Sequence, residues 1–171
     1  MVEHVEAVLQ ETGLPPEKLR LEIVESMLMQ NADSTRTILL RLKQLGVQLL
    51  IDDFGTGYSS LSYLHRFPTS GLKIDRSFVK GIDGSWSNAE LVKTIISICQ
   101  GMNMDVVAEG VETSEQMTKL IALGCKYGQG YFFSTPMEAA SAGEMIGQGL
   151  EHERQASCVG LQPPSVSLRA L

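Results

Sequence analysis

Short runs of β-forming residues alternate along the chain with longer segments of helical periodicity, and this alternation constrains the fold most. The segments predicted as strands are residues 19–24, 47–52, 72–75, 105–109 and 128–132. Strand, helix and strand in succession form the repeating unit of parallel α/β sheets. The sequence therefore predicts an α/β fold with about five parallel strands and intervening helices. Because eight such units close a full barrel, we expect a partial (β/α)8 TIM-type barrel.

Capping residues and glycines mark the predicted helices. The predicted helix starts are Asp33 or Ser34, Ser87 with Glu90, and Thr113 with Gln116. Glycines predicted to end helices are Gly13, Gly46, Gly101 and Gly124. The helix that begins at Ser87 is expected to bury Leu91, Ile95 and Ile98. A last helix is predicted from residue 137 to about 150. We therefore expect one domain over residues 1–150 and a flexible C-terminal tail over residues 151–171.

Charge and composition restrict the partners and the compartment. The formal net charge of −6 argues against a nucleic-acid partner, because such proteins usually carry a basic surface. No uninterrupted apolar run approaches the ~18 residues that span a bilayer, so we expect no membrane segment in this chain. The three cysteines are far apart in sequence and form no Cys-x-x-Cys pair. A reducing, cytoplasmic location fits this pattern best.

Charged residues recur at the carboxyl ends of the predicted strands. Glu22 alternates with apolar neighbours in the first strand, and Lys73 and Asp75 do so in the third. Glu109 ends the fourth, whereas Asp52 and Asp53 lie where the second strand gives way to a glycine-rich loop. Barrel enzymes keep their chemistry at this end of the sheet. These residues are therefore expected to converge on one small area.

A carboxylate that ends a strand is, taken alone, more often a helix cap or a solvated loop residue than a ligand. A cluster is harder to explain in this way, because two carboxylates ~4 Å apart repel by roughly 4 kcal/mol at an effective dielectric of 20. Lys73 supplies one positive charge, and Mg²⁺ or Mn²⁺ would supply the rest. Such a site suits phosphodiester hydrolysis. A barrel enzyme that uses Lys73 as a Schiff-base nucleophile is a further alternative.

Five sequence blocks resemble, in order and spacing, the signature segments of EAL domains. The blocks are Leu21-Glu22-Ile23-Val24-Glu25-Ser26, Asp52-Asp53-Phe54-Gly55-Thr56-Gly57-Tyr58-Ser59-Ser60-Leu61, Leu72-Lys73-Ile74-Asp75, Ala108-Glu109-Gly110-Val111-Glu112-Thr113 and Gly128-Gln129-Gly130-Tyr131. The resemblance covers residues 1 to about 150. It implies hydrolysis of cyclic di-GMP to linear pGpG by two Mg²⁺ or Mn²⁺ ions in a (β/α)8 barrel.

The resemblance also implies roles for individual residues. By motif position, the metal ligands are Glu22, Asp52, Asp53 and Glu109. Lys73 and Glu109 are implied as catalytic residues, Lys73 near the attacking water and Glu109 as general base or metal-associated carboxylate. Residues implied to lie beside the substrate or to support the ligands are Gln129, Asp75, Glu25 and Glu112. Among these, Glu25 is expected to steady the loop that follows the paired aspartates.

The family's Glu-Ala-Leu segment is expected to precede residue 1, together with a metal-binding asparagine. Glu6 lies in a similar-looking stretch, but it is only 16 residues before Glu22, too near for the intervening strands and helices. We therefore expect impaired activity in the 171-residue chain, and a homodimer or an upstream domain to cover the sheet edges. The alternative function is a non-catalytic EAL module that binds cyclic di-GMP or acts through protein contacts.

Overall fold

The computed structural model describes residues 1–30, 32–55, 64–84, 86–145 and 169–170. The strands are β1 (Arg20–Val24), β2 (Gln48–Phe54), β3 (Gly71–Ile74), β4 (Asp105–Glu109), β5 (Tyr127–Gln129) and β6 (Arg169–Ala170). The helices are α1 (Val2–Thr12), the 3₁₀ turn η1 (Pro16–Lys18), α2 (Glu25–Gln30), α3 (Ala32–Gln44), α5 (Arg76–Val79), α6 (Trp86–Gly101) and α7 (Ser114–Ala122). Residues 139–145 are also helical.

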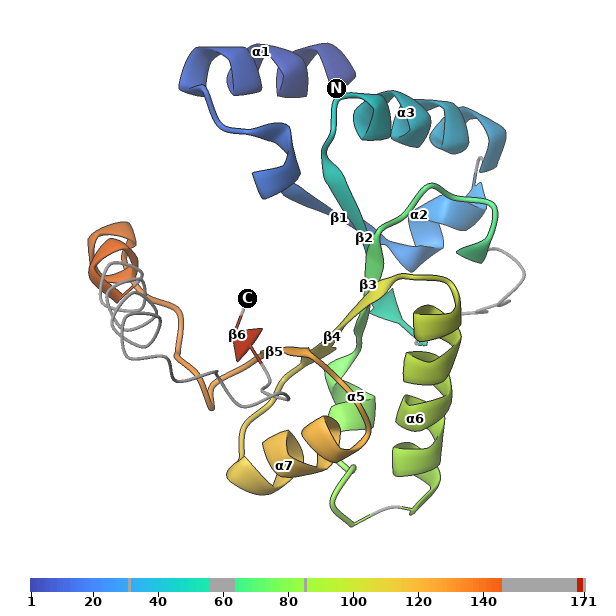
Figure 1. Cartoon of the computed structure of the whole chain (residues 1–171), viewed down its shortest axis with the longest axis vertical. Helices are drawn as coiled ribbons and strands as arrows, with labels where there is room; N and C mark the ends of the chain where they lie inside the picture. Colours follow the sequence, from blue (N-terminus) through green and yellow to red (C-terminus); the bar gives the residue numbers. More distant parts are fainter. Residues whose placement is uncertain (31, 56–63, 85, 146–168, 171) are drawn as a thin grey trace, which may run out of the picture.

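All the strands belong to one parallel sheet in the order β1-β2-β3-β4-β5-β6. The predicted α/β fold with five successive parallel strands is thus confirmed. The sheet is curved (Figure 1), and the Arg20 guanidinium of β1 lies 5.7 Å from the centre of the Tyr127 ring of β5. The two-residue strand β6 pairs with β5. The rest of the predicted tail, residues 151–168 and 171, lies outside the described residues.

The two faces of the sheet have different surroundings: one packs against the helices and the other faces the barrel interior. The core side chains of β2, β3 and β4 include Leu49, Ile51, Leu72, Ile74, Val106 and Ala108. Helices α3 and α6 pack against β2 and β4, respectively, on the outer side of the sheet (Figure 1). Because successive side chains of a strand alternate between its faces, Lys73 and its register partner Val107 occupy the inner face, which is the barrel interior.

Three strands differ in length from the prediction, and β1 does so only by starting at Arg20 rather than at residue 19. β2 continues to Phe54, two residues beyond the expected end, because an irregular step in its pairing with β3 allows the strand to go on. β5 ends at Gln129 rather than at Phe132, because its neighbour β4 ends at Glu109 and the chain turns at Gly130. There the Phe132 amide donates to the Val111 carbonyl instead of extending the ladder.

The helices show both successes and errors of the sequence-based assignment. The Thr113 and Gln116 capping box is present at the start of α7, and Gly13 ends α1 at φ 66°. The assignment of Ser87 as a cap is wrong, because α6 begins at Trp86. Leu91 is 41% exposed, because the buried face of α6 runs one residue later in the helical period, with Val92, Ile96 and Cys99. The short helices α2 and α5 are not in the prediction.

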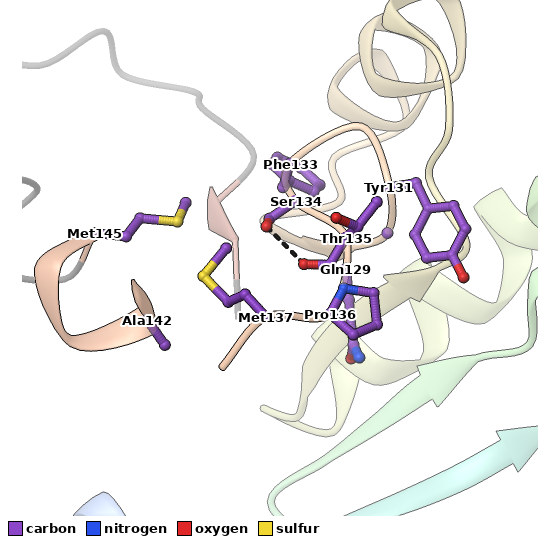
Figure 2. Close-up of a pocket in the computed structure, with 10 residues that line it drawn as sticks. Gln129, Tyr131, Phe133, Ser134, Thr135, Pro136, Met137, Ala142 and Met145 are labelled. Atoms are coloured by element: carbon purple, nitrogen blue, oxygen red, sulfur yellow. Dashed lines mark hydrogen bonds between the residues drawn. The ribbon is translucent and has the colours of Figure 1, made fainter. Parts of the chain in front are cut away.

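An apolar cavity of about 630 Å³ separates the end of β5 from the helix at residues 139–145 (Figure 2). Phe133, Met137 and Met145 are among its lining side chains. No helix in the described parts of the chain is both long and apolar enough to cross a membrane.

Candidate metal and active site

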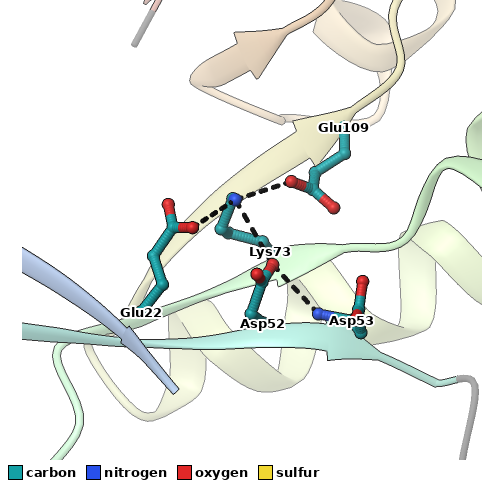
Figure 3. Close-up of polar contacts among 5 residues, drawn as sticks. All are labelled: Glu22, Asp52, Asp53, Lys73 and Glu109. Carbon is teal, nitrogen blue, oxygen red and sulfur yellow. Dashed lines mark hydrogen bonds and ion pairs between the residues drawn. The ribbon is translucent and has the colours of Figure 1, made fainter. Parts of the chain in front are cut away.

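Lys73 lies at the centre of the predicted constellation (Figure 3). Its ammonium is 2.6 Å from Glu109 Oε1, 2.8 Å from Glu22 Oε2 and 3.3 Å from Asp52 Oδ1. Four different strands therefore meet at this one nitrogen, as expected from parallel strands whose carboxyl ends share an edge. The structure thus brings together the carboxylates that the sequence placed near one another.

The Lys73 side chain is nearly closed off from solvent, with only 4% of the residue exposed. Burial by itself would lower the pKa of Lys73, but hydrogen bonds and charge from Glu109 and Glu22 raise it above its ordinary value. The amine therefore stays protonated at neutral pH. A protonated lysine held by three carboxylates is a poor nucleophile, which argues against the Schiff-base alternative.

A bulge in β2 sets the direction of Asp52 and Asp53. Ile51 pairs with Leu72 and Phe54 with Ile74, so β2 takes three steps where β3 takes two. Asp53 absorbs the extra residue with a φ of 55°, in the left-handed region that few non-glycine residues adopt. Its amide nitrogen donates to Asp52 Oδ1 at 3.0 Å. This distortion lets two consecutive carboxylates face one site, although regular strand alternation would separate them.

Oxygen atoms of Asp52, Asp53 and Glu109 all lie within 4.8 Å of one another. Burial raises the pKa of Glu109, and the charges of Asp52 and Asp53 add to this effect, whereas Lys73 opposes it. Glu22 lies outside this close group. It contacts Lys73 from β1 with a side chain that is 47% exposed. Of the four predicted metal ligands, the structure thus groups three closely and holds the fourth through the lysine.

Glu25 supports the loop that follows the aspartates. It is 6% exposed, and its Oε2 atom accepts a hydrogen bond from the Gly55 amide at 3.2 Å. Gly55 has a φ of 99°, and a Cβ atom there would lie 2.7 Å from the Phe78 ring. The backbone at residue 55 is therefore fixed from both sides. The predicted loop runs from about Phe54 to Ser60, and all of it after Gly55 lies outside the described residues.

The remaining predicted residues line a second cavity, of about 480 Å³, beside the carboxylates. Asp75, Glu112 and Gln129 all contribute to its wall, together with Asp53 and Glu109. Asp75 is not part of β3 but caps α5, and its Oδ1 atom accepts a hydrogen bond from the Ser77 amide at 2.9 Å. Burial tends to raise the pKa of Asp75, yet hydrogen bonds from Ser77 and the positive charge of Arg76 lower it on balance.

Two lining residues of this cavity, Arg76 and Tyr131, received no role from the sequence. Arg76 directly follows the Leu72-Lys73-Ile74-Asp75 motif, and Tyr131 ends the Gly128-Gln129-Gly130-Tyr131 motif, so each lies two residues after the end of its strand, β3 or β5. That position is the signal that could have identified them, since barrel sites are built from the residues that follow the strands.

The donor set fits a hard divalent cation. Carboxylate oxygens are the ligands that Mg²⁺ and Mn²⁺ prefer. The group of Asp52, Asp53 and Glu109 offers such atoms at close range on a half-buried surface. Among the described residues, the Lys73 ammonium pairs with Glu22, Asp52 and Glu109, and Asp53 adds a fourth carboxylate close to the last two, so an added cation would relieve repulsion among them.

Comparison with known proteins identifies the domain type. Residues 1–136 match the EAL domain family. The chain is similar to cyclic di-GMP phosphodiesterase NbdA of Pseudomonas aeruginosa, with 46% identity over 146 residues that cover 85% of this chain and 19% of the relative. It is 44% identical over 139 residues to the bifunctional diguanylate cyclase/cyclic di-GMP phosphodiesterase MucR of the same species, covering 81% of this chain and 20% of the relative. The chain thus spans about a fifth of the length of these relatives.

Comparison with solved structures identifies the same type of domain. The MucR phosphodiesterase in complex with cyclic di-GMP has a TM-score of 0.78 and 43% identity, covering 82% of this chain and 57% of that one. The EAL domain of Mycobacterium smegmatis DcpA has a TM-score of 0.83 and 40% identity, covering 86% of this chain and 66% of that one. A manganese and cyclic di-GMP complex of Klebsiella pneumoniae BlrP1 matches with a TM-score of 0.75 at 36% identity, over 79% and 34% of the two chains. This chain belongs to the EAL domain family and corresponds to part of that domain.

Proposed function

We propose that this chain carries part of the two-metal site of a cyclic di-GMP phosphodiesterase, which hydrolyses one phosphodiester bond to give linear pGpG. The observation that carries the proposal is the group of Asp52, Asp53 and Glu109, within 4.8 Å of one another beside Lys73. Relatives named cyclic di-GMP phosphodiesterases, and solved complexes with cyclic di-GMP, support the choice of substrate.

Asp52, Asp53, Glu109 and Glu22 would hold Mg²⁺ or Mn²⁺. When bound, the ions would neutralise phosphate oxygens and lower the pKa of the attacking water. A solved relative with manganese supports Mn²⁺ as one choice.

The chain's own residues divide the remaining work. Glu109 accepts the proton of the attacking water, a role that suits a carboxylate whose burial raises its pKa above the ordinary value. Lys73 keeps Glu109, Glu22 and Asp52 in position through its ammonium, and it stays charged while doing so. Gln129 lies beside Glu109 in the register of β4 and β5, where its amide can orient the water or the phosphate. Glu25 holds Gly55, and with it the loop after Asp53.

Incubation with cyclic di-GMP and Mn²⁺, followed by chromatography of the products, tests the proposal. We expect slow release of linear pGpG from the wild-type chain, in line with the impaired activity predicted from the sequence, and none from Glu109→Gln, which keeps the shape of the side chain but cannot accept the proton. Asp105→Asn is the matched control, because Asp105 is exposed at the opposite end of the same strand. Intact cyclic di-GMP after incubation with the wild type would refute hydrolysis by this chain.

A second candidate is a non-catalytic module that binds cyclic di-GMP. The open side of the site favours it, since the Glu22 side chain is 47% exposed and β1 is an outermost strand of the described sheet. Calorimetric titration separates the two functions: binding of cyclic di-GMP without release of pGpG identifies the module.

The same open face leads us to propose a homodimer or an upstream domain as partner, because an unpaired strand edge favours pairing with another chain. We also propose a cytoplasmic location, where Cys99 and Cys125 would stay reduced as the free thiols seen in the structure.

A further inference from the structure

Lys73 cannot serve as the cation that meets the substrate. Its ammonium already contacts Glu22, Asp52 and Glu109, and only 4% of the residue is exposed. The chain as a whole is acidic, with a formal charge of −6. A dinucleotide bound here, with its phosphate held by the metal ions, therefore needs another positive group to donate hydrogen bonds to a base.

Arg76 is that group among the described residues that line the 480 Å³ cavity, where it is the one basic side chain. It is the first residue of α5, directly after Asp75. Its Cβ atom packs against Gly110, where an added Cβ would lie 2.6 Å away, so the stem of the side chain is held at the cavity wall. The guanidinium remains exposed and free to meet a ligand from the cavity side.

The cavity wall carries two kinds of side chain. Asp53 and Glu109 belong to the carboxylate group. Arg76, Glu112 and Tyr131 supply a cation, an acceptor and an aromatic ring. Tyr131 is 67% exposed, and Figure 2 shows its ring turned away from Met137 and Met145 of the neighbouring apolar cavity. The volume lies within the ~300–1,000 Å³ typical of ligand pockets.

We propose that Arg76, Glu112 and Tyr131 form a guanine-recognition subsite, in which Arg76 is the residue that selects guanine over adenine. The inference rests on the proposed function, because it assumes that a cyclic dinucleotide places its phosphate at the carboxylate group. Guanine presents O6 and N7 as two acceptors on one edge, and an arginine guanidinium can donate to both. Adenine presents an amino group at the O6 position, so the same arginine would face a donor.

The other two residues complete the recognition. Glu112 carries an exposed carboxylate that can accept hydrogen bonds from the N1 and N2 donors of guanine. The Tyr131 ring offers a stacking surface that does not discriminate between bases. Selectivity in this subsite therefore comes from Arg76 and Glu112, and general affinity for a purine comes from Tyr131.

The test is calorimetric titration of the full chain with cyclic di-GMP and with cyclic di-AMP in Ca²⁺, with chromatography of the titrated samples to check that the dinucleotides stay intact. Arg76→Gln keeps the side chain as far as Cδ but removes the guanidinium and its charge, and Arg76→Ala keeps the Cβ contact with Gly110. Lys80→Ala is the matched control, because Lys80 is an exposed cation at the other end of α5 that does not line the cavity. Mn²⁺ binding, measured separately by electron paramagnetic resonance, reports on the carboxylate group.

A bidentate arginine–guanine contact discriminates by roughly 5- to 150-fold. Both Arg76 variants should weaken cyclic di-GMP binding within that range and leave weak cyclic di-AMP binding and Mn²⁺ binding unchanged. Equal losses for both dinucleotides, or no loss for either, would overturn the assignment of Arg76. Failure of the proposed function has a different signature: the wild-type chain would bind Mn²⁺ but neither dinucleotide, which overturns the subsite as well.

Discussion

Replacement of Lys73 by methionine tests how the site is held together without metal. The substitution keeps much of the side-chain volume and removes the ammonium that lies 2.6 Å from Glu109 and 2.8 Å from Glu22. At an effective dielectric of 20, an ion pair at 2.6 Å has a gross attraction of about 6 kcal/mol. Desolvation of the buried ammonium offsets much of this, and the exposed half of Glu22 is screened by water.

The net loss is set by the carboxylates that remain unpaired. Removal of one partner from a buried ion pair typically costs about 3–5 kcal/mol, and we expect a loss of that size for Lys73→Met in a chelator at pH 7. Saturating Mn²⁺ should narrow the difference from wild type, because a cation that replaces the missing charge binds the variant more tightly than it binds wild type. Well above both dissociation constants, each tenfold ratio between them changes the difference in the free energy of unfolding by about 1.4 kcal/mol.

Urea denaturation followed by circular dichroism measures both effects. Lys126→Met is the control, since Lys126 is exposed just before β5, and surface substitutions of this kind usually change stability by less than about 0.5 kcal/mol. If Lys73→Met unfolds at the same urea concentration as Lys126→Met, or if Mn²⁺ fails to narrow its difference from wild type, the reasoning is refuted.

Three further substitutions probe the surroundings of the site. Gly55→Ala should lower the free energy of unfolding by about 1–3 kcal/mol, because its φ of 99° and the Phe78 ring exclude a Cβ; a thermal midpoint equal to wild type would contradict this. Asp75→Ala should destabilise the chain at pH 7, but the difference should shrink as the pH falls from the ordinary value of 3.8 through the lowered folded-state pKa, because protonation removes the stabilisation in wild type as well. Urea titrations at several pH values would show a constant difference if that carboxylate is not the cause. Thr113→Ala should cost about 1 kcal/mol through loss of the α7 capping box, whereas Thr118→Ala, on the exposed side of the same helix, should cost less in the same denaturation assay.

The features that the sequence predicted well are those set by local pattern. β4 has the predicted bounds, Asp105–Glu109, because its alternation and flanking polar residues are all local. The meeting of Glu22, Lys73 and Glu109 follows from one geometric rule, that parallel strands end at the same edge.

The features that escaped prediction depend on partners distant in sequence. The bulge that turns Asp53 toward Asp52 arises from the pairing of β2 with β3, and the sequence around position 53 did not allow us to predict it. Leu91 is exposed because of the orientation of α6 about its own axis against the sheet. A shift of the buried face by one residue along the sequence is enough to move Leu91 to the surface. The place of Arg76 in the cavity depends on the close approach of Gly110 from the next loop.

Binding of Mn²⁺ to the wild-type chain and to Asp53→Asn, followed by electron paramagnetic resonance, tests the metal centre most directly. Asparagine tolerates the left-handed backbone of residue 53 and has nearly the same shape, so the variant removes little besides the charge. The account predicts that wild type and Asp105→Asn bind Mn²⁺ equally and that Asp53→Asn binds it at least about tenfold more weakly, in line with the cost of disturbing a metal site. Equal binding by all three, or no binding by the wild type at millimolar Mn²⁺, would contradict it.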